Sequence, residues 1–305
     1  MRLLVTGASG LLGLNLALEA SRKHEVIGSV NRNLLKNAPF KVIQSDLTQP
    51  GSLEELFEMS QPEWVINCAA LANLEACETR PELAEKLNIE LPEKLAKIVA
   101  KGGARLVHIS TDAVFDGRRG DYSETDTPNP LSKYAETKLL GEECVAAENS
   151  KAIIARVNLF GWSISGKRSL AEWFLNNLST NQYIPGFTDV YFCPLLANDL
   201  GTLLLEMLGM GLSGLYHVVS RDCSSKYDFG QKLADIFGYD RALIQPVSIA
   251  DSDLQVERSQ TLTLKSDKLA KAIGKAPPDL GVCLERFHRQ YLDGYPKIIQ
   301  QMKDY

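Results

Sequence analysis

A glycine-rich stretch near the N-terminus constrains the fold of this chain more than any other feature. Residues 3–6 form a short apolar run, glycines follow at positions 7, 10 and 13, and a helical pattern covers residues 11–21. Gly7 permits a tight turn, Gly10 lets the backbone approach a diphosphate, and Gly13 lets the helix pack closely on the strand. A helix N-terminus offers free N–H groups to phosphate. The stretch predicts a Rossmann dinucleotide site, with contacts from Gly7, Ser9, Gly10, Leu11, Leu12 and Gly13.

Strand and helix patterns alternate through the first half of the chain. Strands are predicted over residues 25–30, 40–44, 64–69, 105–109 and 153–157, and helices over residues 81–100 and 131–148. Alternation of this kind predicts an α/β fold with a Rossmann-type, doubly wound parallel sheet. We expect residues 1–160 to form the NAD(P)-binding domain, joined by a returning segment near 190–220. Residues 161–305 are expected to form a smaller, mixed α/β substrate domain.

The second half has a looser pattern. Helices are predicted over residues 170–178, 199–208 and 226–237, a strand over 214–219, and loops over 179–194. Arg156 and Asn158 lie at the end of the strand over 153–157, near the expected pocket. Arg156 is equally consistent with a structural ion pair and with a phosphate ligand.

Composition excludes several classes of protein. The net charge of −5 argues against nucleic acid as the main partner. Charges interrupt every hydrophobic stretch, so no membrane span is predicted. The apolar run at the N-terminus is too short for a signal peptide and is better explained as a buried strand, so we expect a cytoplasmic protein.

The cysteines and histidines show no spacing typical of a metal site or of a disulfide framework. In a chain without an export signal, we expect the six cysteines to be free thiols. They are Cys68, Cys77, Cys144, Cys193, Cys223 and Cys283. No metal site is predicted.

The end of the second strand bears on the choice of dinucleotide. NAD-preferring sites usually have an acidic residue there, which binds the ribose 2′-hydroxyl. Residues 29–33 contain no acid but include Asn31 and Arg32. A guanidinium group can pair with a 2′-phosphate, so NADP(H) is favoured over NAD(H).

Tyr134 and Lys138 lie four residues apart on a predicted helix and therefore share a face. A nearby ammonium group lowers the pKa of a tyrosine toward the working range, which makes Tyr134 a candidate proton donor to a carbonyl oxygen. Ser110 and Thr111 follow the fifth strand, at the edge where open α/β sheets bind ligands. A hydroxyl group there can hydrogen-bond the substrate oxygen.

Several motifs together resemble the extended short-chain dehydrogenases/reductases, and most of all their dTDP-4-dehydrorhamnose reductase (RmlD-like) branch. The resemblance covers nearly the whole chain, and its most specific part is the block over residues 108–117. The other segments that carry it are residues 6–13, Asp46 with Leu47, residues 67–70, residues 76–78, and Pro130 with Tyr134, Lys138, Gly141 and Glu142.

The resemblance implies nicotinamide-dependent reduction of the 4-keto group of a nucleotide-linked deoxysugar. Tyr134 would donate the proton, Lys138 would hold the nicotinamide ribose, and Thr111 would bind the keto oxygen. The remaining cofactor contacts would come from Asp46, Leu47, Cys68, Ala69, Ala70 and Ser110. The substrate partner would be a sugar nucleotide, and homodimers are frequent in this superfamily.

Two alternatives stay open. The regulatory β subunit of methionine adenosyltransferase resembles the same branch and has Leu-Leu in its glycine loop, as at Leu11 and Leu12 here. A chain of that kind would bind cofactor without turnover. A sugar-nucleotide epimerase would keep Tyr134 and Lys138 but would show no net reduction.

Overall fold

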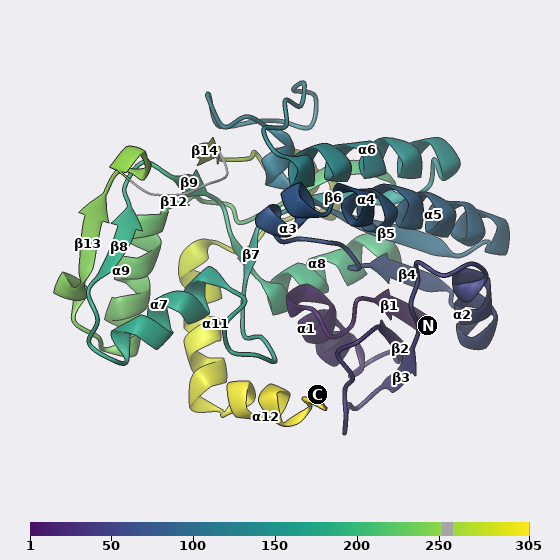
Figure 1. Ribbon diagram of the computed structural model, residues 1–305, viewed down its shortest axis with the longest axis horizontal. Helices are drawn as coiled ribbons and strands as arrows, with labels where there is room; N and C mark the ends of the chain where they lie inside the picture. Colours follow the sequence, from purple (N-terminus) through teal and green to yellow (C-terminus); the bar gives the residue numbers. More distant parts are fainter. Residues whose placement is uncertain (252–258, 305) are drawn as a thin grey trace.

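A seven-stranded parallel sheet forms the centre of the computed structural model, which describes residues 1–251 and 259–304 (Figure 1). The strand order is β11-β6-β5-β4-β1-β2-β3, and every neighbouring pair is parallel. This confirms the predicted α/β fold with a Rossmann-type sheet. The strands are β1 (Arg2–Thr6), β2 (Glu25–Val30), β3 (Lys41–Gln44), β4 (Trp64–Asn67), β5 (Arg105–Thr111), β6 (Ile153–Val157) and β11 (Gly214–Val218).

Helices cover both faces of this sheet, because alternate strand residues point to opposite sides. Leu3 and Val5 belong to a hydrophobic cluster that includes side chains of α1 (Leu11–Ala20) and α8 (Ala197–Gly209). Leu4 belongs to a second cluster, on the opposite face. That cluster is supplied by α2 (Ser52–Ser60), α5 (Leu91–Gly102) and α6 (Lys133–Glu148).

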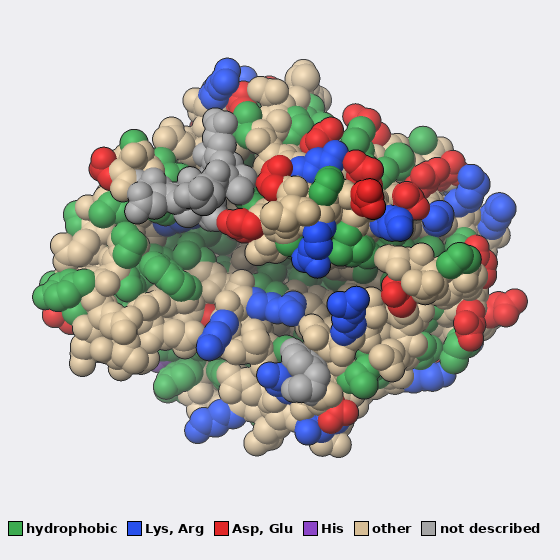
Figure 2. Space-filling view, in the orientation of Figure 1, with side chains coloured by type: hydrophobic (Ala, Val, Ile, Leu, Met, Phe, Trp, Pro, Cys, Tyr) green, Lys and Arg blue, Asp and Glu red, His purple; other side chains and the backbone are tan. Residues whose placement is uncertain are grey.

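The chain beyond β6 builds three small sheets and several helices beside the large sheet. Two of these sheets are strand pairs: β7 (Leu159–Phe160) with β10 (Leu195–Leu196), and β8 (Ile184–Phe187) with β13 (Ile244–Val247). In the third sheet, β9 (Tyr191–Phe192) lies between β12 (Ser224–Ser225) and β14 (Thr261–Leu262). The helices include α7 (Leu170–Leu178), α9 (Lys226–Phe237), α11 (Leu280–Leu292) and α12 (Tyr295–Gln301). A hollow crosses the face where these elements meet the large sheet (Figure 2). Within the described ranges, no helix has the length and apolar character needed to cross a membrane.

The prediction of loops alone over residues 179–194 was wrong. β8 and β9 lie within this segment, and each is hydrogen-bonded to a strand that comes later in the chain. Pro185 and Gly186 interrupt the hydrophobic alternation of β8, so its sequence resembles a turn. The strand is recognisable only from its pairing with β13.

The helix predicted over residues 81–100 is interrupted by a π-helical turn. α4 (Pro81–Glu85) continues into this turn at Lys86–Glu90 and then into α5. Pro92 has no N–H to donate to the carbonyl of Asn88, four residues earlier, so the regular bonding pattern fails there. α6 comes close at the same place, because a Cβ on Gly141 would lie 2.1 Å from the Asn88 carbonyl oxygen.

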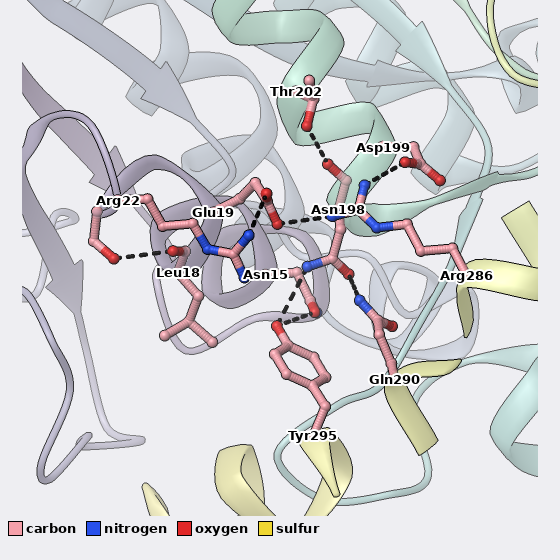
Figure 3. Close-up of polar contacts among 11 residues, drawn as sticks. Asn15, Leu18, Glu19, Arg22, Asn198, Asp199, Thr202, Arg286, Gln290 and Tyr295 are labelled. Carbon is pink, nitrogen blue, oxygen red and sulfur yellow. Dashed lines mark hydrogen bonds and ion pairs between the residues drawn. The ribbon is translucent and has the colours of Figure 1, made fainter. Parts of the chain in front are cut away.

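The C-terminal helices are attached to α1 and α8 by a polar network (Figure 3). Arg286 on α11 donates to Glu19 on α1 at 2.9 Å and also to Asp199 on α8. The Tyr295 hydroxyl at the start of α12 donates to the Asn15 side chain of α1 at 2.8 Å. These contacts fix the helix whose N-terminus carries the glycine loop.

The expectation that all cysteines are free thiols was wrong for two of them. Cys193 and Cys223 form a disulfide, with their Cα atoms 4.1 Å apart. β9 and β12 are antiparallel with Phe192 opposite Ser224, so the next residue outward on each chain also stands opposite its partner. The pairing follows from this register rather than from cysteine spacing. Cys68, Cys77, Cys144 and Cys283 are free, as expected.

Substituting Gly13 tests the close packing of the glycine loop. A Cβ at Gly13 would lie 2.3 Å from the Gly7 carbonyl oxygen, so Gly13→Ala should lower the free energy of unfolding by about 1–3 kcal/mol. Gly209→Ala is the matched control, because its Cβ would meet only Trp64, at 3.9 Å. We expect this control to leave stability unchanged or slightly raised. Urea denaturation compares the two variants, and equal stability would contradict the packing argument.

Candidate functional site

A cleft of about 810 Å³ opens at the carboxyl ends of β1, β4, β5 and β6. Because parallel strands end at one edge of a sheet, loops that are distant in sequence meet there. The structure brings ten of the residues predicted for the site into the cleft lining. They are Gly10, Leu11, Leu12, Gly13, Cys68, Ala70, Ser110, Thr111, Tyr134 and Lys138.

The other predicted residues lie outside the lining. Gly7 and Ala69 are in contact just behind it, since a Cβ on Gly7 would lie 2.9 Å from the Ala69 nitrogen. Arg32 follows β2, and Asp46 follows β3. Hydrogen bonds from Thr48 lower the pKa of Asp46, and the positive charge of Arg32 lowers it further. The remaining ones are Ser9, Asn31 and Leu47.

The glycine loop presents bare backbone to the cleft. Gly7 has φ +66°, a conformation that glycine adopts without strain, and its carbonyl accepts the Gly10 N–H at 2.9 Å. Gly10 is the N-cap of α1 and supplies no side-chain cap, and the first turn of α1 has no acidic residue. The first N–H groups of a helix have no partner within it. The residues present therefore fit the diphosphate of a dinucleotide.

Tyr134 lies in the first turn of α6, which begins after Ser132, whose side chain accepts the Ala135 N–H. Burial raises the pKa of Tyr134 to about 12, and a hydrogen bond with the Thr111 side chain acts in the opposite direction. The expected net lowering of this pKa was therefore wrong, because desolvation of the phenolate dominates. Tyr134 is protonated at neutral pH and stands beside the Thr111 hydroxyl.

Lys138 is only 2% exposed. Its Nζ donates to the Ile109 carbonyl at 2.7 Å and lies 3.5 Å from Nε2 of His108. Burial lowers the pKa of Lys138 to about 8, and the carboxylate of Glu142 opposes this shift. Lys138 therefore changes charge within a physiologically accessible pH range.

A row of buried polar side chains continues from Lys138 beneath the cleft. Asn67 lies 3.2 Å from Nδ1 of His108 and accepts the Thr6 hydroxyl at 2.6 Å. Burial, and then the neighbouring ammonium group, hold the pKa of His108 well below its usual value, so its ring is neutral. Sequence reasoning missed this arrangement, because His108 has no partner nearby in the chain.

The role of Arg156 is decided by Glu142 on α6. The guanidinium binds this carboxylate through Nε at 3.0 and 3.1 Å and through a terminal nitrogen at 2.7 Å. The Ser110 hydroxyl donates to the same carboxylate, and Arg156 also lies over the Phe115 ring, 5.0 Å from its centre. Arg156 is therefore a buried ion-pair partner, and it does not line the cleft.

Asp112 and Asn158 also line the cleft, at the strand ends where ligands were expected, although neither was assigned a role in the predicted site. The Asn158 amide donates to one Asp112 oxygen at 2.5 Å, and the Thr111 hydroxyl donates to the other at 3.0 Å. Burial raises the pKa of Asp112 to about 6, against the effect of these hydrogen bonds. Their place in the sequence could have indicated this, because Asp112 and Asn158 directly follow the carboxyl ends of the neighbouring strands β5 and β6.

Comparison with known families gives a match over nearly the whole chain. Residues 1–292 match the model of the RmlD substrate binding domain. A probable low-salt glycan biosynthesis reductase of Haloferax volcanii is 34% identical, over 90% of this chain and 93% of that protein. A dTDP-4-dehydrorhamnose reductase of Mycobacterium tuberculosis is 30% identical, over 89% of this chain and 87% of that protein. Methionine adenosyltransferase 2 subunit beta of Xenopus laevis is 29% identical, over 81% and 75%.

Solved structures show the same similarity. A dTDP-4-dehydrorhamnose reductase of Clostridium acetobutylicum superimposes with a TM-score of 0.83 at 27% identity, covering 96% of this chain and all of that one. A dTDP-4-dehydrorhamnose reductase of Bacillus anthracis, solved in complex with NADP, has a TM-score of 0.81 at 23% identity and covers 95% and 99%. The second likeness shows the shared fold alone.

Removing Glu142 tests the buried ion pair. The two side chains are only 3% and 6% exposed, so Glu142→Ala leaves Arg156 charged and without a carboxylate. We expect the free energy of unfolding to fall by about 3–5 kcal/mol. The control is Glu90→Ala, which breaks the exposed pair with Lys94 and should cost less than about 1 kcal/mol. Urea denaturation at neutral pH measures both variants, and similar losses would contradict the assignment.

Proposed function

This chain belongs to the RmlD substrate binding domain family, and we propose that it is an NADP(H)-dependent reductase of the 4-keto group of a nucleotide-linked deoxysugar. NAD(H) is the alternative cofactor. The observation that carries the proposal is that Thr111, Tyr134 and Lys138 line the same cleft as the glycine loop. The cleft therefore combines backbone N–H groups that suit a dinucleotide diphosphate with a proton donor.

The side chains have separate tasks in this reaction. When bound in this cleft, a reduced nicotinamide would supply the hydride for the carbonyl carbon. Tyr134 is protonated at neutral pH and donates a proton to the keto oxygen, which the Thr111 hydroxyl holds by a hydrogen bond. The ammonium of Lys138 stabilises the phenolate that remains on Tyr134.

The proposed cofactor contacts follow the edge of the sheet. Arg32 would pair with the 2′-phosphate of NADP(H), since no acidic residue ends β2. The other proposed contacts are Gly7, Ser9, Gly10, Leu11, Leu12, Gly13, Asn31, Asp46, Leu47, Cys68, Ala69, Ala70, Ser110, Tyr134 and Lys138.

A second candidate function is cofactor binding without turnover. The similarity to methionine adenosyltransferase 2 subunit beta favours it, because that similarity also spans most of this chain. The two functions differ in one measurable property. A reductase consumes NADPH in the presence of a keto sugar, whereas a regulatory subunit only binds it.

Replacing Tyr134 by Phe tests the proton donor. The variant keeps the ring but loses the hydroxyl, so kcat for NADPH oxidation with a dTDP-4-keto-6-deoxysugar should fall by about a hundredfold or more. The affinity for NADPH, measured by fluorescence, should stay within about twofold. Tyr291→Phe is the control, since Tyr291 lies half-exposed on α11 outside the cleft, and it should keep full activity. NADPH binding by the wild-type protein without turnover on any keto sugar would favour the second function.

The pH dependence of reduction tests Lys138. Its pKa is lowered to about 8, so the ammonium is present below this pH and is lost as the pH rises through it. Because the ammonium stabilises the phenolate, kcat/KM should fall above about pH 8. Lys138→Arg keeps its charge at these pH values, so its residual activity should lack this decline. A wild-type profile that stays flat to about pH 10 would contradict the role of Lys138.

A further inference from the structure

Two adjacent cations stand on the loop between β7 and α7. This dibasic loop, residues 163–169, carries Lys167 and Arg168, and both side chains are exposed. Both residues line the same cleft as Leu11 and Tyr134. Figure 2 shows Lys and Arg side chains along the hollow in this face of the molecule. Neither residue belongs to a motif that the sequence alone indicates.

The backbone of the dibasic loop is fixed by one buried carboxylate. Glu172, in the first turn of α7, is 2% exposed. It accepts the N–H groups of Ser163 at 2.6 Å, Arg168 at 2.9 Å and Ser169 at 3.1 Å, and also the Ser163 hydroxyl at 2.8 Å. A carboxylate can accept several such bonds, whereas an amide offers only one oxygen. The loop that carries the two cations is therefore pre-organised.

The charge of the cleft is opposite in sign to that of the whole chain. Among the described residues, its lining holds the cations Lys138, Lys167 and Arg168 but only one acidic residue, Asp112. The chain as a whole has a net charge of −5. Among residues 1–251 and 259–304, no carboxylate forms an ion pair with Lys167 or Arg168. A cleft of this charge concentrates anions.

We propose that Lys167 and Arg168 form a binding site for a diphosphate group, held in position by Glu172. The guanidinium can bind phosphate oxygens in a bidentate manner, and the ammonium adds a point charge. The choice of ligand rests on the proposed function, which brings two diphosphate-containing molecules to the cleft: the dinucleotide and the sugar nucleotide. The N-terminus of α1 already provides N–H groups for one diphosphate. The dibasic loop would therefore bind the second diphosphate, which is that of the sugar nucleotide.

The test compares ligands with and without a diphosphate. Isothermal titration measures dTDP, UDP, the nucleosides thymidine and uridine, and NADPH against the full chain. For Lys167→Gln/Arg168→Gln, affinity for the nucleoside diphosphates should fall about ten- to a hundredfold, with nucleoside and NADPH affinities unchanged. The salt dependence of dTDP binding should also weaken. The control is Lys101→Gln/Lys151→Gln, which removes two exposed lysines remote from the cleft lining and should bind like the wild type.

The other outcomes are also decisive. A loss of NADPH affinity alone would keep the diphosphate site but assign it to the dinucleotide. The proposal would be overturned if the Lys167→Gln/Arg168→Gln variant bound every ligand as tightly as the control variant. It would also be overturned if the wild-type protein bound nucleoside diphosphates no better than nucleosides while the double variant bound NADPH normally. Diphosphate binding that depends on Lys167 and Arg168, without turnover of any keto sugar, would keep the site and reject the proposed reductase.

Glu172→Gln separates positioning from general stability. The variant loses acceptors for the loop N–H groups, so dTDP affinity should fall several-fold while thymidine affinity is unchanged. Titrations are made well below the melting temperature of the variant. A purely structural role would lower the melting temperature and leave the dTDP affinity intact, and that result would overturn the positioning role of Glu172.

Discussion

The ion pair between Arg156 and Glu142 is the interaction on which the candidate site depends most. Arg156 belongs to β6, Glu142 belongs to α6, and the Ser110 hydroxyl of β5 donates to the same carboxylate. Three elements are thereby joined at the edge of the sheet where the cleft opens. Because Tyr134 and Lys138 are on α6, this contact helps to set their distance from Thr111. A buried pair contributes little net stability, but its geometry is specific.

Two glycines, Gly13 on α1 and Gly141 on α6, allow their helices to pack closely on neighbouring backbone, because glycine has no side chain. α1 can begin directly behind the glycine loop because Gly13 has no Cβ to meet the Gly7 carbonyl. α6 can approach the π-helical turn because Gly141 has no Cβ to meet the carbonyl of Asn88. The Asn88 side chain also binds the backbone N–H of Leu71 at 2.9 Å, and Leu71 lines the cleft. One wall of the cleft is therefore set by backbone packing.

The fold could be predicted because its signals are local. The glycines at 7, 10 and 13 and the strand–helix alternation lie in short windows, so the parallel sheet follows from sequence. The partners of Arg156, His108 and Cys193 could not be predicted, because each is set by strand order and register. The pKa of Tyr134 was misjudged for a related reason: helical spacing indicates a neighbouring charge but says nothing of burial. In the sequence, Lys167 and Arg168 cannot be distinguished from any exposed basic pair, because only the folded structure places them in the cleft lining.

The row of side chains beneath the cleft, from Thr6 through Asn67 and His108 to Lys138, has a consequence for sequence divergence. Each member is buried and meets the next at a single polar contact. Replacing one by an apolar residue would leave its neighbour with an unpaired polar atom, at a cost of about 1–3 kcal/mol. Replacing neighbouring partners together avoids much of that cost. Thr6, Asn67 and His108, on three adjacent strands, are therefore expected to diverge as a linked set beside Lys138, so that the identity of residue 6 carries information about residue 108.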